Sequence, residues 1–288
     1  MPVNNVAALY SLPSFKGHSY NLSLDNSSRY RAAGVWELNN AGLVPTQGSI
    51  SVYAGDVRYA LLILFRSFYG STYQFQGNFT MFTAAPGDWL KQDVTFQTDR
   101  YLHSAVLTAA GGKSEFRISA NAVFAPAWNK IVAQMLQGQP IQQVGNPVFT
   151  WCAFPGPPTP VSGLSPNLVY ARVTQQLYAE PIKGFGHVCG FSYFILIQAL
   201  NNGAISAKVV AQDVWVLSGA FQSLVRQMLS CQVSLAAATV NNTLAQAFGN
   251  FSGVSEVYLL PGTLSNVLLA SGVVDGNALD DLTVVIRF

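Results

Sequence analysis

Apolar and polar residues alternate along much of this chain, which is the pattern of half-buried β-strands. Residues 73–83 read YQFQGNFTMFT, in which Gly77 marks a candidate bulge. Residues 101–110 and 113–124 flank a Gly-Gly pair and predict a hairpin. The same reasoning predicts further strands at residues 49–53, 60–65, 147–153, 167–177, 256–260 and 282–288.

The clearest hairpin lies in the second half of the chain. Residues 191–200 and 205–217 flank an Asn-Asn-Gly-Ala sequence, and Asn-Gly supplies the positive φ angles of a tight turn. The first arm, FSYFILIQAL, is almost entirely apolar, so we expect both of its faces to be buried. The second arm is mixed, and Lys208 and Asp213 predict an edge that faces water.

Two segments carry helical periodicity instead. Residues 126–136 and 221–233 place apolar residues at the i, i+3, i+4, i+7 spacing of an amphipathic helix. Pro126 suits the first turn of the former. Weaker helical patterns cover residues 240–248 and 264–270. The fold class that these patterns predict is mainly β with a few amphipathic helices (α+β), as a sandwich-like or irregular β domain.

One segment has the composition of a linker. Residues 154–162 hold four prolines and separate the strand-like segments on either side. Neither half looks complete by itself, so we expect one domain over residues 1–288 with a Pro-rich loop at 154–162. The apolar ending, residues 282–288, predicts a strand that is tied into a sheet.

The charge content is unusually low. Lys, Arg, Asp and Glu make up 10% of the 288 residues, whereas about 25% is usual for a globular domain. The longest strongly apolar run, residues 188–200, is shorter than the roughly 20 residues of a membrane-spanning helix. The N-terminus lacks the pattern of a signal peptide. We therefore expect a soluble chain without a membrane span, whose surface other protein subunits largely cover.

No catalytic, cofactor-binding or metal-binding residue can be assigned from the sequence. The cluster GFGHVCG at residues 184–190 does not fit a nucleotide loop, because the third glycine is displaced and a strand follows. His187 and Cys189 share a face of that strand, but no orienting acid or amide lies nearby. The three histidines and three cysteines lack metal-ligand spacing; they are His18, His103, His187, Cys152, Cys189 and Cys231.

The aspartate and glutamate residues do not indicate a catalytic site either. Three pairs could supply a general acid and base, and none has a distinctive spacing. They are Asp280 with Asp281, Asp93 with Asp99, and Glu37 with Asp56. The chain also has no GxSxG motif, so the sequence predicts a protein that is not an enzyme and carries no cofactor.

In its low charge, polar uncharged residues, aromatics and Pro/Gly-broken β segments, the chain resembles structural proteins of non-enveloped viruses. Without a basic arm it resembles a clamp or outer capsid protein of the turreted reovirus kind, a double-stranded RNA virus. The resemblance implies a virion protein, assembled in the host cytoplasm, that contacts copies of itself or another capsid shell protein and not nucleic acid. Contacts would then concentrate in residues 1–20, residues 154–162 and the last strand. The alternative is a lectin-like or receptor-attachment module, because 35 aromatic residues (18 Phe, 12 Tyr, 5 Trp) are also suited to stacking on sugars.

Overall fold

The computed structural model describes most of the chain. The described residues are 4–24, 30–43, 47–55, 58–67, 78–95, 101–110, 115–152, 168–249, 251–261, 272–275 and 282–288. They form a mainly β protein with three helices, so the predicted α+β class is confirmed. The elements group into two compact units, which are described separately. The single domain expected over residues 1–288 stays a prediction, because two compact units can belong to one domain or to two.

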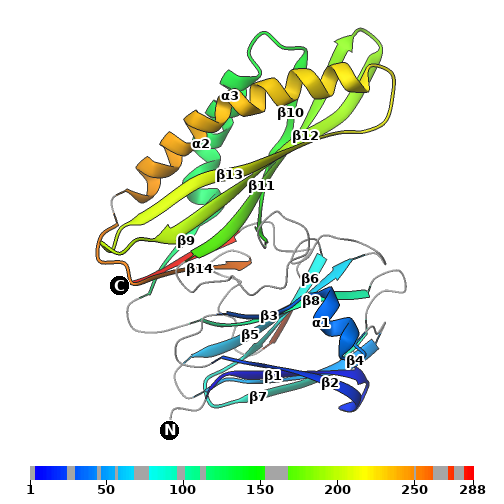
Figure 1. Ribbon diagram of the computed structural model, residues 1–288, viewed down its shortest axis with the longest axis vertical. Coiled ribbons are helices and arrows are strands. Elements are labelled where there is room, and N and C mark those ends of the chain that lie inside the picture. Colours follow the sequence, from blue (N-terminus) through cyan, green and yellow to red (C-terminus); the bar gives the residue numbers. More distant parts are fainter. Residues whose placement is uncertain are drawn as a thin grey trace. The chain divides into compact units, whose positions relative to one another are not determined.

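The first unit contains two antiparallel sheets and the short helix α1 (Val35–Asn40) (Figure 1). The first sheet has the order β2 (Lys16–Ser23), β1 (Val6–Leu12), β4 (Gln47–Tyr53) and β7 (Trp89–Thr95). The second has the order β15 (Gly272–Asp275), β6 (Asn78–Ala84), β5 (Tyr59–Ser67), β8 (Tyr101–Ala110) and β3 (Tyr30–Ala33). Both sheets contribute to one apolar core, in which Leu9, Ile50 and Leu62 are 0–1% exposed.

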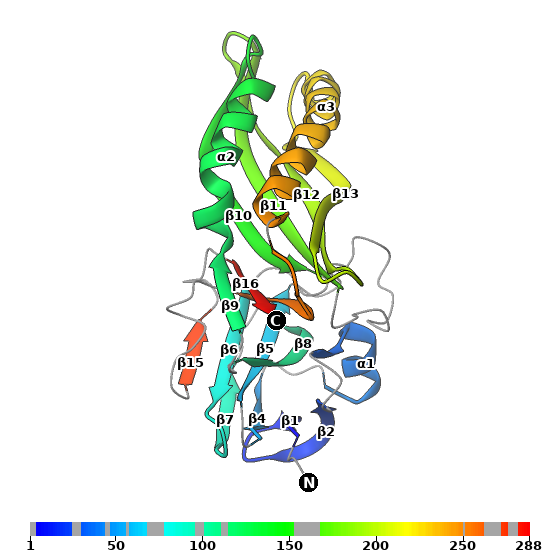
Figure 2. The same cartoon turned by 90° about the vertical axis from the view of Figure 1, so that its left-hand side faces the viewer.

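The second unit is a four-stranded antiparallel sheet with two helices on one face (Figure 2). Its strand order is β10 (Ile141–Cys152), β11 (Leu168–Ile182), β12 (Phe185–Ala199) and β13 (Ile205–Val216). The helices α2 (Ala120–Met135) and α3 (Gln222–Phe248) lie side by side. A fourth sheet has the order β14 (Glu256–Pro261), β16 (Leu282–Arg287) and β9 (Glu115–Ser119).

The predicted hairpin at residues 191–217 is confirmed as β12 and β13. Side chains of β12 are buried on both faces from Cys189 to Ile195, as its apolar sequence required. Lys208 and Asp213 are exposed on the edge strand β13, also as predicted. The glycine-rich segment before residue 191 forms the beginning of the buried strand β12.

Side chains of helix α3 cover the backbone of the edge strand β13. The Asn241 side-chain oxygen accepts a hydrogen bond from the Val209 N–H at 2.6 Å. Gln222 donates to the Val216 carbonyl at 2.9 Å, where the strand ends. These bonds satisfy backbone groups that an edge strand otherwise leaves open to other chains.

Three sequence predictions near residue 120 are wrong in whole or in part. Residues 115–119 of the strand predicted at 113–124 form β9, but helix α2 begins at Ala120, where Ser119 caps it by accepting the Ala122 N–H at 3.2 Å. Pro126 therefore lies inside the helix and not in its first turn. The hairpin of residues 101–110 with 113–124 is also wrong, since β8 pairs with β5 and β3 while β9 neighbours β16.

The remaining predictions divide into three groups. Strands β4, β5, β6, β8, β10, β11, β14 and β16 confirm the described parts of the segments predicted there. The helical pattern at 126–136 lies in α2, and the two patterns at 221–233 and 240–248 are one helix, α3. Strands β1, β2, β3, β7 and β15 and helix α1 were not predicted. The segments 73–77, 154–162 and 264–270 lie outside the described residues.

The last strand is tied into a sheet, as its composition predicted. β16 is the central strand of three, and residues 282–286 are at most 1% exposed, so this strand is not an open contact surface. None of the described helices combines the length and apolar character needed to cross a membrane.

Candidate functional site

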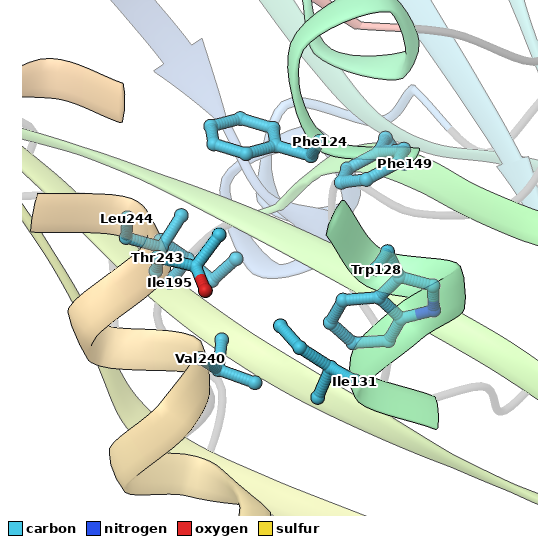
Figure 3. A pocket seen from close by; sticks show the side chains of 8 residues that line it. All are labelled: Phe124, Trp128, Ile131, Phe149, Ile195, Val240, Thr243 and Leu244. Carbon is cyan, nitrogen blue, oxygen red and sulfur yellow. The ribbon is translucent and has the colours of Figure 1, made fainter. Parts of the chain in front are cut away.

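An apolar pocket lies inside the second unit, between the two helices and the sheet (Figure 3). Its cavity volume is about 10 Å³, room for about one water-sized sphere, within about 260 Å³ of space that includes open solvent. Eight side chains line it, seven of them apolar: Phe124, Trp128 and Ile131 from α2, Phe149 from β10, Ile195 from β12, and Val240, Thr243 and Leu244 from α3.

Helix and strand periodicity bring these side chains together. On α2 the spacing from Phe124 to Trp128 and Ile131 is four and then three residues, which keeps all three on one face. On α3 the buried positions recur every three or four residues along the helix, and Val240 and Leu244 belong to that stripe. On β12, Ile195 is two residues from Tyr193, so both point toward the helices.

The lining offers no unsatisfied polar group to a ligand. The hydroxyl of Thr243 donates to the Thr239 carbonyl of its own helix at 3.0 Å. The indole N–H of Trp128 donates to the Gln175 side-chain oxygen at 3.1 Å. Figure 3 shows the indole nitrogen on the side of the ring away from Val240. A molecule in this space would therefore meet apolar surface and few other groups.

Gln175 holds the Trp128 ring through a buried polar network. Its side chain is fully buried on β11, and its amide nitrogen donates to the carbonyls of Val144 at 3.1 Å and Gly145 at 3.3 Å. Those carbonyls lie at the irregularity in β10, where its register against β11 shifts between Val144 and Val148. The Gln175 side chain thus provides hydrogen bonds to the carbonyls of the bulge and orients the Trp128 indole.

Aromatic contacts fix the rest of the wall. Phe124 stacks on Phe149 with ring centroids 5.9 Å apart. Trp128 lies 5.8 Å from Phe191 and 5.8 Å from Tyr193 by the same measure. The Tyr193 hydroxyl donates to the Val233 carbonyl of α3, which ties that helix to the sheet.

The sequence candidates for catalysis do not gather at this pocket. His187 and Cys189 are both buried on β12, and the His187 Nε2 atom has no hydrogen-bond partner among the described residues. Burial raises the pKa of the Cys189 thiol to about 11. At neutral pH this cysteine stays protonated, whereas a nucleophile must be a thiolate.

The other candidates lie apart. His18 is exposed on β2, His103 is buried on β8, and Cys231 is exposed on α3. Within the described part of the chain, no three His, Cys, Asp or Glu residues are placed to hold a metal ion. The Cys152 side chain is not among those described.

The carboxylate pairs cannot be assembled from the described residues, because Asp56, Asp99, Asp280 and Asp281 lie outside them. Glu37 accepts the Gly34 N–H at 3.0 Å at the start of α1, which is a helix-capping role. Asp93 accepts the Ser14 N–H at 2.8 Å.

Sequence reasoning found part of the pocket without recognising it. The helical pattern at 126–136 marked Trp128 and Ile131 as one apolar face, and the weaker pattern at 240–248 contained Val240 and Leu244. Phe124 was missed because its segment was predicted as a strand. No sequence signal indicated that these faces leave space between them.

Comparisons with known proteins leave the family open. No protein-family model matches the chain, and no curated protein matches it significantly. Among solved structures, it is similar to a lipopolysaccharide binding protein at 9% identity and a TM-score of 0.26, over 99% of this chain and 91% of that one. It is also similar to P47 of Clostridium botulinum E1 at 7% identity and a TM-score of 0.21, over 99% of this chain and 98% of that one. Neither similarity is close enough to show a shared fold.

Proposed function

We propose that this protein is a non-catalytic binding protein that takes a small apolar molecule, or the apolar end of a larger one, into the pocket between α2, α3 and the sheet. One observation carries the proposal: the pocket is lined by seven apolar side chains, and its one hydroxyl is already bonded to its own helix. Apolar cavities of about 150 Å³ stay dry and bind apolar guests, and the lining here has the same chemistry around a smaller space.

The size of the pocket limits the ligand. Pockets for drug-sized molecules enclose roughly 300–1,000 Å³. The cavity here is about 10 Å³, within about 260 Å³ of space that includes open solvent. A short alkyl chain or a single ring therefore enters only when the lining side chains move apart, and a longer molecule would extend through the opening.

Ligand binding should also stabilise the folded state. A ligand that binds only the folded state raises its stability by mass action. Ligand binding can therefore be followed as a rise in melting temperature.

The test is a thermal unfolding series with 1-octanol as the probe. We expect octanol to raise the melting temperature of the wild type. Val240→Phe, which fills the pocket, should abolish that rise, and Thr243→Phe, placed on a half-buried lining position, should reduce it. Leu235→Phe is the matched control, since Leu235 lies on the same helix and is 69% exposed.

Two results would contradict the proposal. One is the absence of any octanol-dependent rise in the wild type. The other is an equal rise in Val240→Phe and Leu235→Phe, which would place octanol elsewhere on the protein.

A second candidate function is the structural one that the composition suggested: a capsid or clamp subunit in a virion, in contact with copies of itself or another shell protein. Exposed apolar side chains support it, since Trp36, Trp89 and Leu217 are 65%, 56% and 57% exposed in a chain with 10% charged residues. Light scattering across a concentration series tests the self-assembling form. Discrete large particles would support it, and a monomer at every concentration would exclude it.

A further inference from the structure

Strand β7 is an open edge of the sheet β2–β1–β4–β7 in the first unit (Figure 1). Among the described residues, β7 pairs with β4 on one side and with no strand on the other. Its register against β4 runs without a break from Trp89 to Thr95, and its sequence, WLKQDVT, contains no proline. An edge of this kind presents a row of backbone N–H and C=O groups that can pair with another chain.

The other edge strands of the two four-stranded sheets are protected. The β1–β2 pairing has a register shift, and the Arg31 side chain donates to the Ser23 carbonyl of β2 at 3.2 Å. β10 has a register shift with Pro147 inside it, and side chains of α3 cover β13. Bulges, prolines and covering groups keep edge strands from pairing, and the described part of β7 has none of them. It does carry Lys91 and Asp93, and a charge repels an approaching strand only where that strand has the same sign.

Alternate residues of β7 turn their backbone groups toward the open edge. The Ala54 N–H donates to the Asp88 carbonyl at 3.1 Å, so the backbone carbonyl of Asp88 points toward β4. On the far side of the sheet, the Leu24 N–H donates to the Asn5 carbonyl at 2.9 Å, and following the registers across β1 and β4 gives the same alternation. The residues whose N–H and C=O groups face the open edge are therefore Trp89, Lys91, Asp93 and Thr95.

Charge selects one register for a second copy of β7. Two copies related by a two-fold axis would run antiparallel, and only residues that face the open edge can form hydrogen-bonded pairs. A register centred on Lys91 places lysine opposite lysine, and one centred on Asp93 places aspartate opposite aspartate. The register centred on Gln92 instead places Lys91 of each copy opposite Asp93 of the other. Opposite charges stabilise a strand pair and like charges destabilise it, so the sequence of β7 favours the register centred on Gln92.

The same register continues the apolar core. Leu90 and Val94 are half-buried and pack against the core of the first unit. In the register centred on Gln92, each Leu90 lies opposite Val94 of the other copy, so the two side chains cover each other's exposed parts. Side-chain pairs along this strand are thus matched, apolar with apolar and positive with negative.

We propose that two copies of this chain pair through β7 as antiparallel strands, in the register centred on Gln92. The two sheets then form one continuous sheet, with two equivalent ion pairs between Lys91 and Asp93. The Asp93 carboxylate accepts the Ser14 N–H at 2.8 Å and has capacity for a second donor, because a carboxylate accepts several hydrogen bonds. The Lys91 ammonium, 5.3 Å from the centre of the Trp89 ring, turns on its flexible side chain toward the second copy.

This dimer goes beyond both candidate functions. A two-fold contact is closed, since it uses the same edge of both chains and leaves none for a third. It therefore predicts a dimer, whereas a self-assembling shell requires further contacts. The contact lies in the first unit and the apolar pocket in the second, so the dimer can fail without affecting the octanol result, and the reverse is also true.

The test is sedimentation velocity of the full chain over a concentration series, with Lys91→Glu and Asp93→Lys as variants. We expect the wild type to pass from monomer to dimer as the concentration rises. Each variant places like charges opposite each other at both ion-pair positions, so each should weaken dimerisation at least about tenfold. Lys208→Glu is the matched control and should dimerise like the wild type, because Lys208 is an exposed lysine on the covered edge strand β13.

A mixture of the two variants tests the register itself. A Lys91→Glu chain has two acidic residues at these positions and an Asp93→Lys chain has two basic ones, so a mixed dimer places opposite charges at both contacts. An equimolar mixture should form dimers at concentrations where each variant alone is monomeric.

Four results would overturn the proposal. They are a wild type that is monomeric at every concentration, an oligomer that Lys91→Glu leaves unchanged, an equal loss in Lys208→Glu, and a mixture of the variants that stays monomeric. Lys91→Glu leaves the bond between Asp93 and Ser14 intact, so its result does not depend on that bond.

Discussion

The Gln175–Trp128 hydrogen bond keeps a polar group out of the apolar pocket, and removing it has a calculable cost. The substitution Gln175→Leu replaces the amide with an apolar side chain of similar size on β11. The variant leaves the buried indole N–H of Trp128 without its acceptor. An unsatisfied buried donor costs about 1–3 kcal/mol.

The bulge adds a smaller contribution to that cost. Gln175 also donates to the carbonyls of Val144 and Gly145, both exposed residues, so water can partly replace those bonds. Losing these two hydrogen bonds should lower the free energy of unfolding by about 1–2 kcal/mol. We expect a decrease of about 2–5 kcal/mol in the free energy of unfolding.

Urea denaturation followed by circular dichroism measures this decrease, with the denaturant slope checked for constancy. Gln176→Leu is the matched control, because the neighbouring side chain is exposed and should cost less than about 0.5 kcal/mol. In a Trp128→Phe background the donor is absent, so Gln175→Leu should cost about 1–3 kcal/mol less. Equal effects of Gln175→Leu and Gln176→Leu, or no coupling to Trp128, would refute the reasoning.

Three further predictions concern the sheet of the second unit. A Cβ at Gly190 would collide with the Trp215 indole and lie 2.5 Å from a backbone carbonyl oxygen of β11. Gly190→Ala should therefore lower the free energy of unfolding, measured in urea, by about 1–3 kcal/mol. An unchanged value would contradict this packing. The Cys189 pKa is raised from 9.0 to about 11, so the folded state holds its proton more tightly than the unfolded state does. The contribution of the protonated Cys189 thiol to the free energy of unfolding is fully present below pH 9 and falls by about 2–3 kcal/mol as the pH rises to 11. When the free energy of unfolding is measured over this pH range, Cys189→Ala should show a smaller decrease than the wild type. An equal decrease in both proteins would contradict the assignment. Tyr193→Phe removes the hydroxyl that donates to Val233 and should cost about 0.5–1.5 kcal/mol by the same assay, whereas no change would show that the bond contributes nothing.

Local patterns predicted the second unit better than the first. The apolar arm at 191–200 and its Asn-Gly turn identified β12 and β13, because both signals lie within a few residues of each other. Helix α3 was predicted in two pieces, since residues 234–239 hold Leu235 as their one large apolar residue and so interrupt the apolar periodicity. Burial of Val240 and the bond from Val209 to Asn241 stabilise the helix there, and neither is visible locally.

Strand β1 was missed because its two faces do not differ in polarity. Its core residues Ala7 and Leu9 alternate with Val6, Ala8 and Tyr10, which are also apolar or aromatic, so no polar period of two appears. Reasoning from polar and apolar alternation therefore fails for this strand.

The network around Gln175 shows the other limit of the sequence. The alternation of Val173, Gln175 and Leu177 places a glutamine on the core face of β11, and that much can be read from the pattern. Its partners Trp128 and Val144 come from segments 47 and 31 residues away. Only the tertiary structure shows that the buried amide is satisfied.

The most direct test of the apolar binding pocket is a crystal structure of the protein soaked with 1-iodooctane, in which the iodine is located by its anomalous scattering. The proposal predicts the octyl chain between Ile131, Ile195 and Val240, with iodine in the pocket or at its opening. A fully soaked crystal with no anomalous peak at this place, or with iodooctane bound only on the outer surface, would contradict it.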